Sequence, residues 1–289
     1  MTSGFSSRIS INGVCFSGQS LQDDLSFCDE HGLSYLTVPM SKVDEAGPEA
    51  SRSAIRRSAV TVDTTLLPSL FTLEDESVWP SETRRIIDAI DFAANIGASA
   101  IYTTTGPAGR MAWEDATNAL ARALRPALDY AASRDVMLLV ESTPPMYAHF
   151  GFVFHLDEVV ELTRRTGLGL VIDVFGVYHE RHLLQTIREA AGEIRLVQVS
   201  DYVPGQLTPD NSRAVPGDGV VPLPDILRTV LDTGYGGLFD IETFGPRIEQ
   251  EGASDAVLRG ARFLSGVLRG EEARRATATR ALSGKAPRD

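Results

Sequence analysis

Apolar runs alternate with amphipathic segments along most of the chain. Eight short runs are rich in Val, Ile, Leu and Thr and almost continuously apolar, which is typical of parallel strands buried on both faces. They span residues 8–16, 34–40, 59–67, 99–106, 136–143, 168–175, 194–201 and 237–244. Segments with helical spacing lie between or after these runs, at residues 21–32, 81–97, 113–135, 155–167, 182–192, 223–234 and 254–270. This alternation predicts a single-domain α/β protein, an eight-stranded (β/α)8 TIM barrel.

Local signals refine two of the predicted helices. In the segment 81–97, Ser81 is a suitable N-cap and Gly97 a suitable C-cap, since serine accepts from free N–H groups and glycine adopts the left-handed conformation. The segment 113–135 contains Pro126, which lacks a backbone donor, so we expect a kink or a break there.

The domain limits follow from the same pattern. An open doubly wound sheet is the competing architecture, but no glycine cluster of the dinucleotide-binding type follows the first apolar run. We expect the barrel to occupy residues 1–270. Residues 271–289 are rich in Arg, Ala and Ser without an apolar stripe, which predicts a disordered C-terminal tail.

Charge and composition exclude several kinds of function. The net charge of −12 disfavours a nucleic-acid partner, because such binding depends on clustered cations. Lys42 and Lys285 are the only lysines, and neither belongs to a predicted strand end, so we expect no Schiff-base chemistry. The only cysteines, Cys15 and Cys28, form no CxxC pair and are expected to be buried thiols in a reducing compartment. Without a secretory signal pattern or an apolar run of about 20 residues, we expect a cytoplasmic protein with no membrane partner.

Four consecutive predicted strands end in a residue with a side-chain oxygen. These residues are Glu141, Asp173, Gln198 and Glu242. Because the C-terminal ends of barrel strands face the active-site rim, we expect the four side chains to meet there. Three carboxylates in one site require a compensating cation, and an all-oxygen shell favours Mn²⁺ or Mg²⁺, with Co²⁺ or Zn²⁺ as alternatives. Alternatively, each acid caps the following helix or pairs with a loop arginine.

The motifs around these residues resemble those of the xylose isomerase-like TIM barrels, a group of sugar phosphate isomerases and epimerases that includes endonuclease IV-type repair enzymes. The resemblance covers residues 8–270, and its strongest pieces are ESTPP, IDVFG, VQVSD, RAVPGDGVVPLPDIL and GYGGLFDIETFGPR. The metal ligands of that group are Glu, Asp, His and Glu at these strand ends. By resemblance, the ligands here are Glu141, Asp173, Gln198 and Glu242, with one divalent ion per chain.

The chain departs from the group at two positions. Gln198 stands where the group has histidine, and Gly176 stands where the group often has a substrate-contacting histidine. His179 and His182 follow nearby; each is expected to begin a surface helix, and the alternative is that one of them reaches the rim in place of the missing histidine. The resemblance also implies that Arg213, in a loop, binds substrate oxygens over the metal; the alternative is a surface arginine.

Three further residues are candidates for substrate binding. His149 precedes the aromatic segment GFVF, so that loop is either a lid over the rim or part of the core. Phe16, at the end of the first strand, and Trp113 are candidate walls of the pocket, and each also suits the core.

We therefore expect a metal-dependent isomerase or epimerase that acts on a sugar or other small polyhydroxy ketone through an enediolate. Glu141 and Glu242 are its catalytic acid and base. The main alternative is a lyase, of the dehydratase or C-glycoside-cleaving kind, that uses the same enolate chemistry. A non-catalytic sugar-binding or partner protein is a second alternative, and a nuclease is disfavoured because five histidines cannot supply a histidine-rich zinc cluster. We expect a homo-oligomer, a dimer or a tetramer, whose substrate is a sugar, keto-polyol or glycoside.

Overall fold

The computed structural model describes residues 4–205 and 213–283. Eight parallel strands close into a barrel in chain order, each hydrogen-bonded to its sequence neighbour and β8 to β1. The strands are β1 Ile9–Asn12, β2 Tyr35–Pro39, β3 Thr61–Leu67, β4 Ala100–Thr103, β5 Met137–Val140, β6 Gly169–Asp173, β7 Ile194–Val199 and β8 Phe239–Ile241. The predicted fold class is confirmed.

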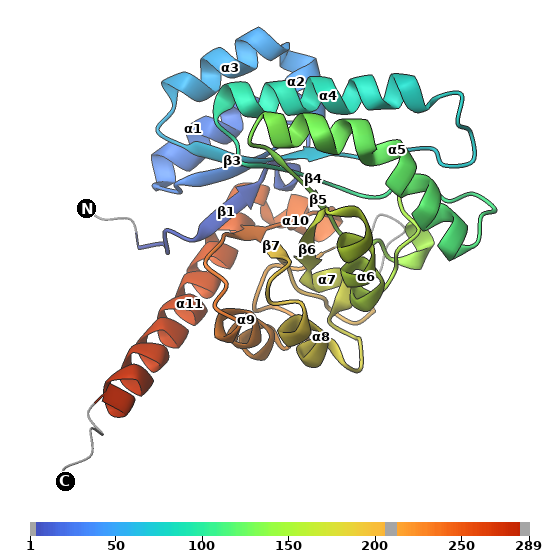
Figure 1. Cartoon of the computed structure of the whole chain (residues 1–289). Helices are drawn as coiled ribbons and strands as arrows, with labels where there is room; N and C mark the ends of the chain where they lie inside the picture. Colours follow the sequence, from blue (N-terminus) through green and yellow to red (C-terminus); the bar gives the residue numbers. More distant parts are fainter. Residues whose placement is uncertain (1–3, 206–212, 284–289) are drawn as a thin grey trace.

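Helices surround the barrel (Figure 1). They are α1 Leu21–His31, α2 Met40–Ala46, α3 Pro48–Arg57, α4 Trp79–Ile96, α5 Trp113–Ser133, α6 Leu156–Thr166, α7 Val174–Val177, α8 Leu183–Glu189, α9 Leu223–Asp232, α10 Pro246–Glu251 and α11 Ala253–Ser283. Two short 3-10 helices, η1 Gly13–Cys15 and η2 Pro145–Tyr147, follow β1 and β5. No helix in the described ranges is long and apolar enough to cross a membrane.

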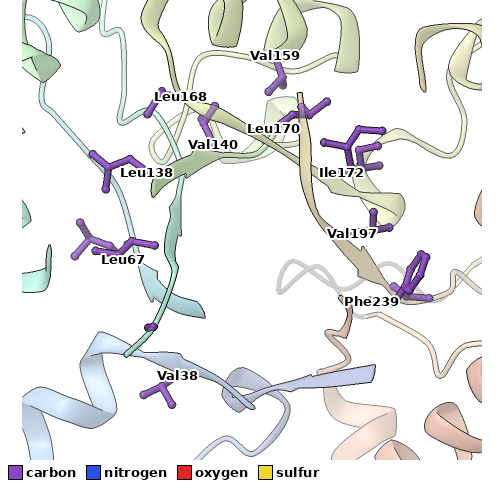
Figure 2. Packing of buried hydrophobic residues seen from close by; sticks show 14 of the residues in the cluster. Val38, Leu67, Leu138, Val140, Val159, Leu168, Leu170, Ile172, Val197 and Phe239 are labelled. Atoms are coloured by element: carbon purple, nitrogen blue, oxygen red, sulfur yellow. The ribbon is translucent and has the colours of Figure 1, made fainter. Parts of the chain in front are cut away.

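Strand alternation divides the core into two parts. One set of strand side chains packs outward against the helices, as Figure 2 shows for Leu138, Val140 and Ile172. The alternate residues form a separate cluster inside the barrel: Ala100, Tyr102, Leu139, Val171 and Leu196, with Leu66 and Leu238 beside them. Each strand therefore presents one set of residues to the barrel interior, and the next residues of that set lie at the rim.

Three local predictions can be compared with the helices. Gly97 is the left-handed C-cap of α4, as predicted, but α4 begins at Trp79 with Val78 as its N-cap, so Ser81 is not the cap. Pro80 sits in the first turn, where its missing N–H costs nothing, which explains the earlier start. Pro126 lies inside a continuous α5, so it does not break the helix.

The helix α11 also differs from the sequence expectation. It continues to Ser283 and extends away from the barrel (Figure 1), where a disordered tail is expected from residue 271. Glu271 explains part of this difference, since its carboxylate pairs with Arg228 of α9 at 3.0 Å and with Arg274 at 2.5 Å. The remaining part of that tail, residues 284–289, lies outside the described residues.

Candidate metal and acid–base site

The four strand-end residues all belong to the interior face of the barrel. The register pairs Asp173 of β6 with Gln198 of β7, and Gln198 with Asp240 of β8. Glu242 lies two residues beyond Asp240 and therefore points to the same face. Glu141 follows β5 and lies two residues beyond Leu139, which is part of the interior cluster. The fold thus places all four side chains at one half of the rim, as the strand order predicts.

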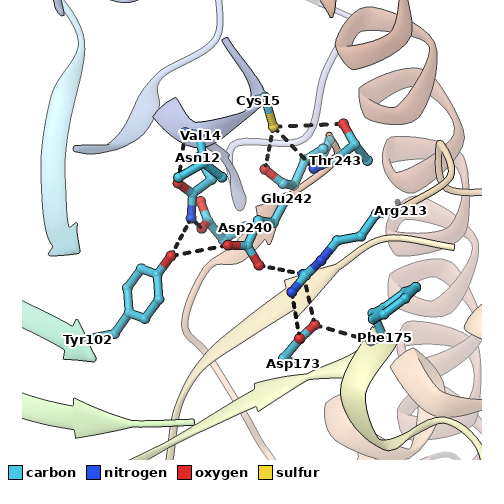
Figure 3. Close-up of polar contacts among 11 residues, drawn as sticks. Asn12, Val14, Cys15, Tyr102, Asp173, Phe175, Arg213, Asp240, Glu242 and Thr243 are labelled. Atoms are coloured by element: carbon cyan, nitrogen blue, oxygen red, sulfur yellow. Dashed lines mark hydrogen bonds and ion pairs between the residues drawn. The ribbon is translucent and has the colours of Figure 1, made fainter. Parts of the chain in front are cut away.

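Arg213 lies between Asp173 and Glu242 (Figure 3). Its Nη1 donates to Asp173 Oδ1 at 3.1 Å and to Glu242 Oε2 at 2.5 Å, and its Nη2 donates to Asp173 Oδ2 at 2.9 Å. All three side chains are buried, with residue exposures of 8% for Arg213, 2% for Asp173 and 6% for Glu242. Arg213 thus lies at the rim, while its predicted binding of substrate oxygens over a metal stays a prediction. The sequence did not predict its hydrogen bonds to Asp173 and Glu242, which are two of the predicted metal ligands.

Aromatic rings and backbone contacts hold the guanidinium in place. Its Cζ atom lies 5.1 Å from the ring centre of Phe175 and 5.0 Å from that of Phe244, both within cation–π range. The backbone N–H of Arg213 donates to the carbonyl of Phe244 at 2.9 Å. Arg213 is therefore fixed on both its main chain and its side chain, which rules out the surface-arginine alternative.

Asp201 fixes the loop that carries Arg213. Its Oδ1 accepts from the backbone N–H groups of Tyr202 at 2.8 Å and Val221 at 3.0 Å, and its Oδ2 accepts from Gly217 at 3.0 Å. Its main chain also forms an antiparallel bridge with Ala214. Asp201 was not among the predicted site residues. The signal that could have indicated it is an aspartate that ends an apolar run and precedes a glycine-rich loop, because such a side chain often accepts hydrogen bonds from the loop backbone.

A polar network inside the barrel supports Glu242 from below (Figure 3). Tyr102 donates its hydroxyl to Glu242 Oε1 at 3.3 Å, and Asn12 Nδ2 donates to the Tyr102 oxygen at 2.8 Å and to Asp240 Oδ2 at 2.9 Å. Thr37 donates to the other oxygen of Asp240 at 2.9 Å. These residues come from β1, β2, β4 and β8. The sequence signal that could have found them is the presence of polar residues at interior positions of otherwise apolar strands.

The two glutamates have different electrostatic environments. Burial raises the pKa of Glu141 well above its ordinary value, and the negative charges of Glu242 and Asp173 raise it further. Burial raises the pKa of Glu242 to about 7, while the positive charge of Arg213 opposes that increase. Burial alone would lower the pKa of Arg213, but the charges of Asp173 and Glu242 outweigh it and raise that pKa. The two glutamates are therefore set apart by the nearby guanidinium, which is bonded to Glu242 and not to Glu141.

The donor atoms suit a divalent cation in type and charge. Glu141 Oε2 and both polar atoms of the Gln198 amide are buried and lack a hydrogen bond of good geometry within the described residues, although the Gln198 amide is close enough to Glu141 to lower the pKa of that carboxyl. Buried acceptors without partners indicate a missing donor or cation. Three carboxylates also exceed the single charge of Arg213. The residues therefore fit an oxygen-preferring ion such as Mn²⁺ or Mg²⁺.

The ligands are nevertheless not gathered around one point. In the part of the chain that the structure describes, no group of three or more His, Cys, Asp or Glu side chains is arranged to hold a metal ion. The reason is that the Arg213 guanidinium lies between Asp173 and Glu242 and uses three of their four oxygens. The role of all four residues as ligands stays a prediction.

Phe16 belongs to the core. It is fully buried, and its ring contacts that of Phe27 at a centroid distance of 4.8 Å, so it is not a pocket wall. Its carbonyl accepts from Lys42 Nζ at 3.0 Å, and the same ammonium pairs with Asp24 at 2.5 Å. Lys42 lies in α2, three residues after the end of β2, and its ammonium is held in a buried ion pair.

Trp113 and His149 lie farther out. Trp113 begins α5, lines a cavity of about 350 Å³ with Phe152 and Phe154, and is covered by Arg165 at 5.3 Å from its ring. His149 is exposed on the segment after β5 and packs against Phe150 at a centroid distance of 4.1 Å. Within the described residues, Arg213 forms its side-chain hydrogen bonds with Asp173 and Glu242 and not with Trp113 or His149, so substrate binding by these two residues stays a prediction.

The nearby histidines do not reach the site. His179 is exposed after α7, and His182 is the exposed N-cap of α8, as the sequence indicates. At Gly176, the position of an added Cβ lies 3.5 Å from Asp173 Oδ2 and 3.4 Å from Ser142 Oγ. A side chain from that position could contact the rim, but here it is absent.

Comparisons with known proteins agree with the fold. A sequence model described as "Xylose isomerase-like TIM barrel" matches residues 25–265. An inosose isomerase of Halalkalibacterium halodurans is 29% identical over 104 residues, which are 35% of this chain and 36% of that protein. The alignment thus spans only about a third of that curated relative.

Solved structures show the same fold. The structure of IolI protein with a bound zinc atom superimposes with a TM-score of 0.79 at 17% identity, covering 90% of this chain and 97% of that one. D-psicose 3-epimerase of Clostridium cellulolyticum H10, with D-tagatose, gives a TM-score of 0.73 at 13% identity, covering 92% and 98%. At these identities the similarity concerns the fold alone.

Proposed function

Because the chain belongs to the xylose isomerase-like TIM barrel family, we propose that it is a divalent-metal-dependent isomerase or epimerase of a sugar or related small polyhydroxy ketone. Glu141, Asp173, Gln198 and Glu242 would hold Mn²⁺ or Mg²⁺, and Arg213 would bind substrate oxygens. The names of similar proteins, an inosose isomerase and a D-psicose 3-epimerase, support a hydroxy-ketone as the substrate class.

The observation that carries this proposal is a pair of glutamates, Glu242 buried and Glu141 half-buried, that face one fixed cation differently. Glu242 accepts hydrogen bonds on both oxygens, from Arg213 and from Tyr102, which stabilises its ionised form. Glu141 has a buried Oε2 without a partner and a pKa well above its ordinary value. Such a difference is what acid and base exchange at one carbon requires.

The roles of the two residues follow from this difference. Glu242 takes the proton from the carbon next to the carbonyl, and the electron pair of that C–H bond moves into an enediolate. Glu141 returns a proton, to the neighbouring carbon in an isomerisation or to the opposite face of the same carbon in an epimerisation. A divalent ion bound at this site would polarise the carbonyl and so acidify that C–H bond. Arg213 holds an oxygen on which negative charge develops.

A lyase is the second candidate, and Gly176 is the observation that favours it. A position beside Asp173 that could carry a substrate-contacting side chain has none. The substrate is then held differently from the usual family arrangement, and the same enolate could lose a β-substituent in place of regaining a proton.

Proton exchange tests the proposal and separates the two candidates. The protein with Mn²⁺ is incubated in D₂O with free ketohexoses and cyclic keto-polyols, and the products are followed by NMR. We expect deuterium at the carbon next to the carbonyl, with water loss only if the chain is a lyase. Both Glu141→Gln and Glu242→Gln should reduce exchange by at least about 100-fold. Turnover without deuterium uptake, or full exchange in either variant, would contradict the assignment.

A further inference from the structure

Arg213 and a divalent ion require the same oxygen atoms. Both oxygens of Asp173 and one oxygen of Glu242 accept hydrogen bonds from the guanidinium (Figure 3). A carboxylate oxygen that ligates a metal at short range cannot also hold a buried N–H group pointing from the same side. The guanidinium and the ion are therefore alternative occupants of this part of the rim.

The surroundings favour the guanidinium strongly. Arg213 is packed between Phe175 and Phe244, and its backbone is bonded to Phe244, so little side-chain freedom is lost on pairing. The bidentate bond to Asp173 is the arrangement in which arginine binds carboxylates best. An ion entering this site must break three charge-assisted hydrogen bonds within the buried site.

The opposite side of the rim favours the ion only weakly. Gln198 supplies a neutral amide, which offers a cation no charge, at the strand end where the resemblance implies a histidine. Among the described residues, the side-chain hydrogen bonds of the guanidinium go to Asp173 and Glu242 and not to this side. An ion could thus find two ligand oxygens on this side, from Glu141 and Gln198. It still needs the carboxylates of Asp173 and Glu242 to balance its positive charge.

We propose that Arg213 is a built-in competitor for the metal, so that the guanidinium and the divalent ion bind Asp173 and Glu242 in mutual exclusion. Metal binding then has a second effect, because the ion releases the Arg213 guanidinium, which becomes free to bind a substrate oxygen. This inference rests on the proposed metal site, and it assigns to the chain a low metal affinity that the substrate can increase by giving Arg213 a new partner.

Metal affinity in the absence of substrate tests the competition directly. Binding of Mn²⁺ alone is measured by calorimetry and by the EPR signal of free Mn²⁺, for the wild type, Arg213→Gln and Arg213→Lys. We expect Arg213→Gln to bind Mn²⁺ at least about tenfold more tightly, since charge-assisted bonds to two carboxylates no longer compete. Arg213→Lys should lie between the two, because a lysine cannot form the bidentate pair.

Two controls make each outcome decisive. Arg259→Gln removes the same charge from an exposed pair with Asp218 and Glu251, and it should leave the affinity unchanged. Asp173→Asn in the Arg213→Gln background should abolish the gain. If Arg213→Gln shows no unfolding transition in a thermal scan, the Mn²⁺ affinity of Arg213→Lys, compared with that of the wild type, tests the competition.

The results separate the two proposals. Mn²⁺ binding that depends on Asp173 but is equal or weaker in the Arg213 variants would overturn the competition and leave the metal site intact. Mn²⁺ binding that is independent of Asp173 in every variant would overturn both.

Discussion

Each buried acid at the rim has a different way of compensating its charge. Asp173 is paired with a guanidinium, Glu242 shares that guanidinium and adds a phenol, and Asp240 has only neutral donors. Burial disfavours the ionised form of a carboxylate that has no cation beside it, and so raises its pKa. Burial accordingly raises the pKa of Asp240 to about 6, with the hydrogen bonds from its neutral partners opposing the increase.

Asp240 gives a prediction about pH and stability. Since its pKa in the folded protein lies above the ordinary value of 3.8, folding takes up a proton between pH 3.8 and about 6. The stability from this uptake is complete below that window and is lost as the pH rises through it. Relative to Asp240→Asn, the wild type should lose about 2 kcal/mol of unfolding free energy between about pH 4.5 and pH 7. Urea unfolding at both pH values measures this, and a constant difference would contradict it.

Tyr102 gives a prediction about catalysis. Its hydroxyl links Asn12 to Glu242, so Tyr102→Phe should lower kcat by about tenfold with little change in KM, because the base loses its fixed orientation. Tyr130→Phe is the matched control, since that hydroxyl bonds Asp91 on the surface. An effect of Tyr102→Phe on KM alone would indicate a role in packing only.

Among the elements, the segment after β7 decides where Arg213 lies. Asp201 captures three backbone N–H groups of this segment, and Gly219 passes so close that an added Cβ would lie 2.2 Å from the carbonyl of Tyr202. The segment is therefore built by backbone contacts that have no periodic pattern. This is why the strand ends and Gly97 could be predicted from sequence, while the position of Arg213 came only from resemblance.

Replacing Asp201 tests the importance of this segment. Asp201→Ala leaves one buried and two partly buried N–H groups without this acceptor and should lower the unfolding free energy by about 2–3 kcal/mol. Asp218→Ala in the same segment removes only an exposed pair with Arg259 and should cost less than about 1 kcal/mol. Chemical denaturation of both variants measures these changes. Equal losses of unfolding free energy in the two variants would contradict the special role of Asp201.

For the whole molecule, the barrel was predictable because its eight strands repeat one pattern, whereas contacts between distant strands were not. The Tyr102–Asn12–Asp240 network joins β4, β1 and β8, and no spacing along the chain indicates it. The same holds for the ion pairs of Glu271 with Arg228, which join α11 to α9 and extend the helix beyond residue 270.

Truncation tests the predicted domain limit. Ending the chain after Gly270 keeps the buried face of α11, including Leu264 and Leu268, and removes the ion pairs of Glu271. We expect a folded protein that is about 1 kcal/mol less stable. Ending it after Gly252 should prevent folding, because α11 packs on β1 and β8. Loss of folding in the longer variant would place residues 271–283 inside the domain.

The anomalous signal of Mn²⁺ in crystals of the protein tests the central claim most directly. We predict one ion in ligand contact with side-chain oxygens of Glu141, Asp173, Gln198 and Glu242, with the Arg213 guanidinium displaced from Asp173. An ion bound elsewhere, or a rim that keeps all three Arg213 hydrogen bonds at saturating Mn²⁺, would contradict it.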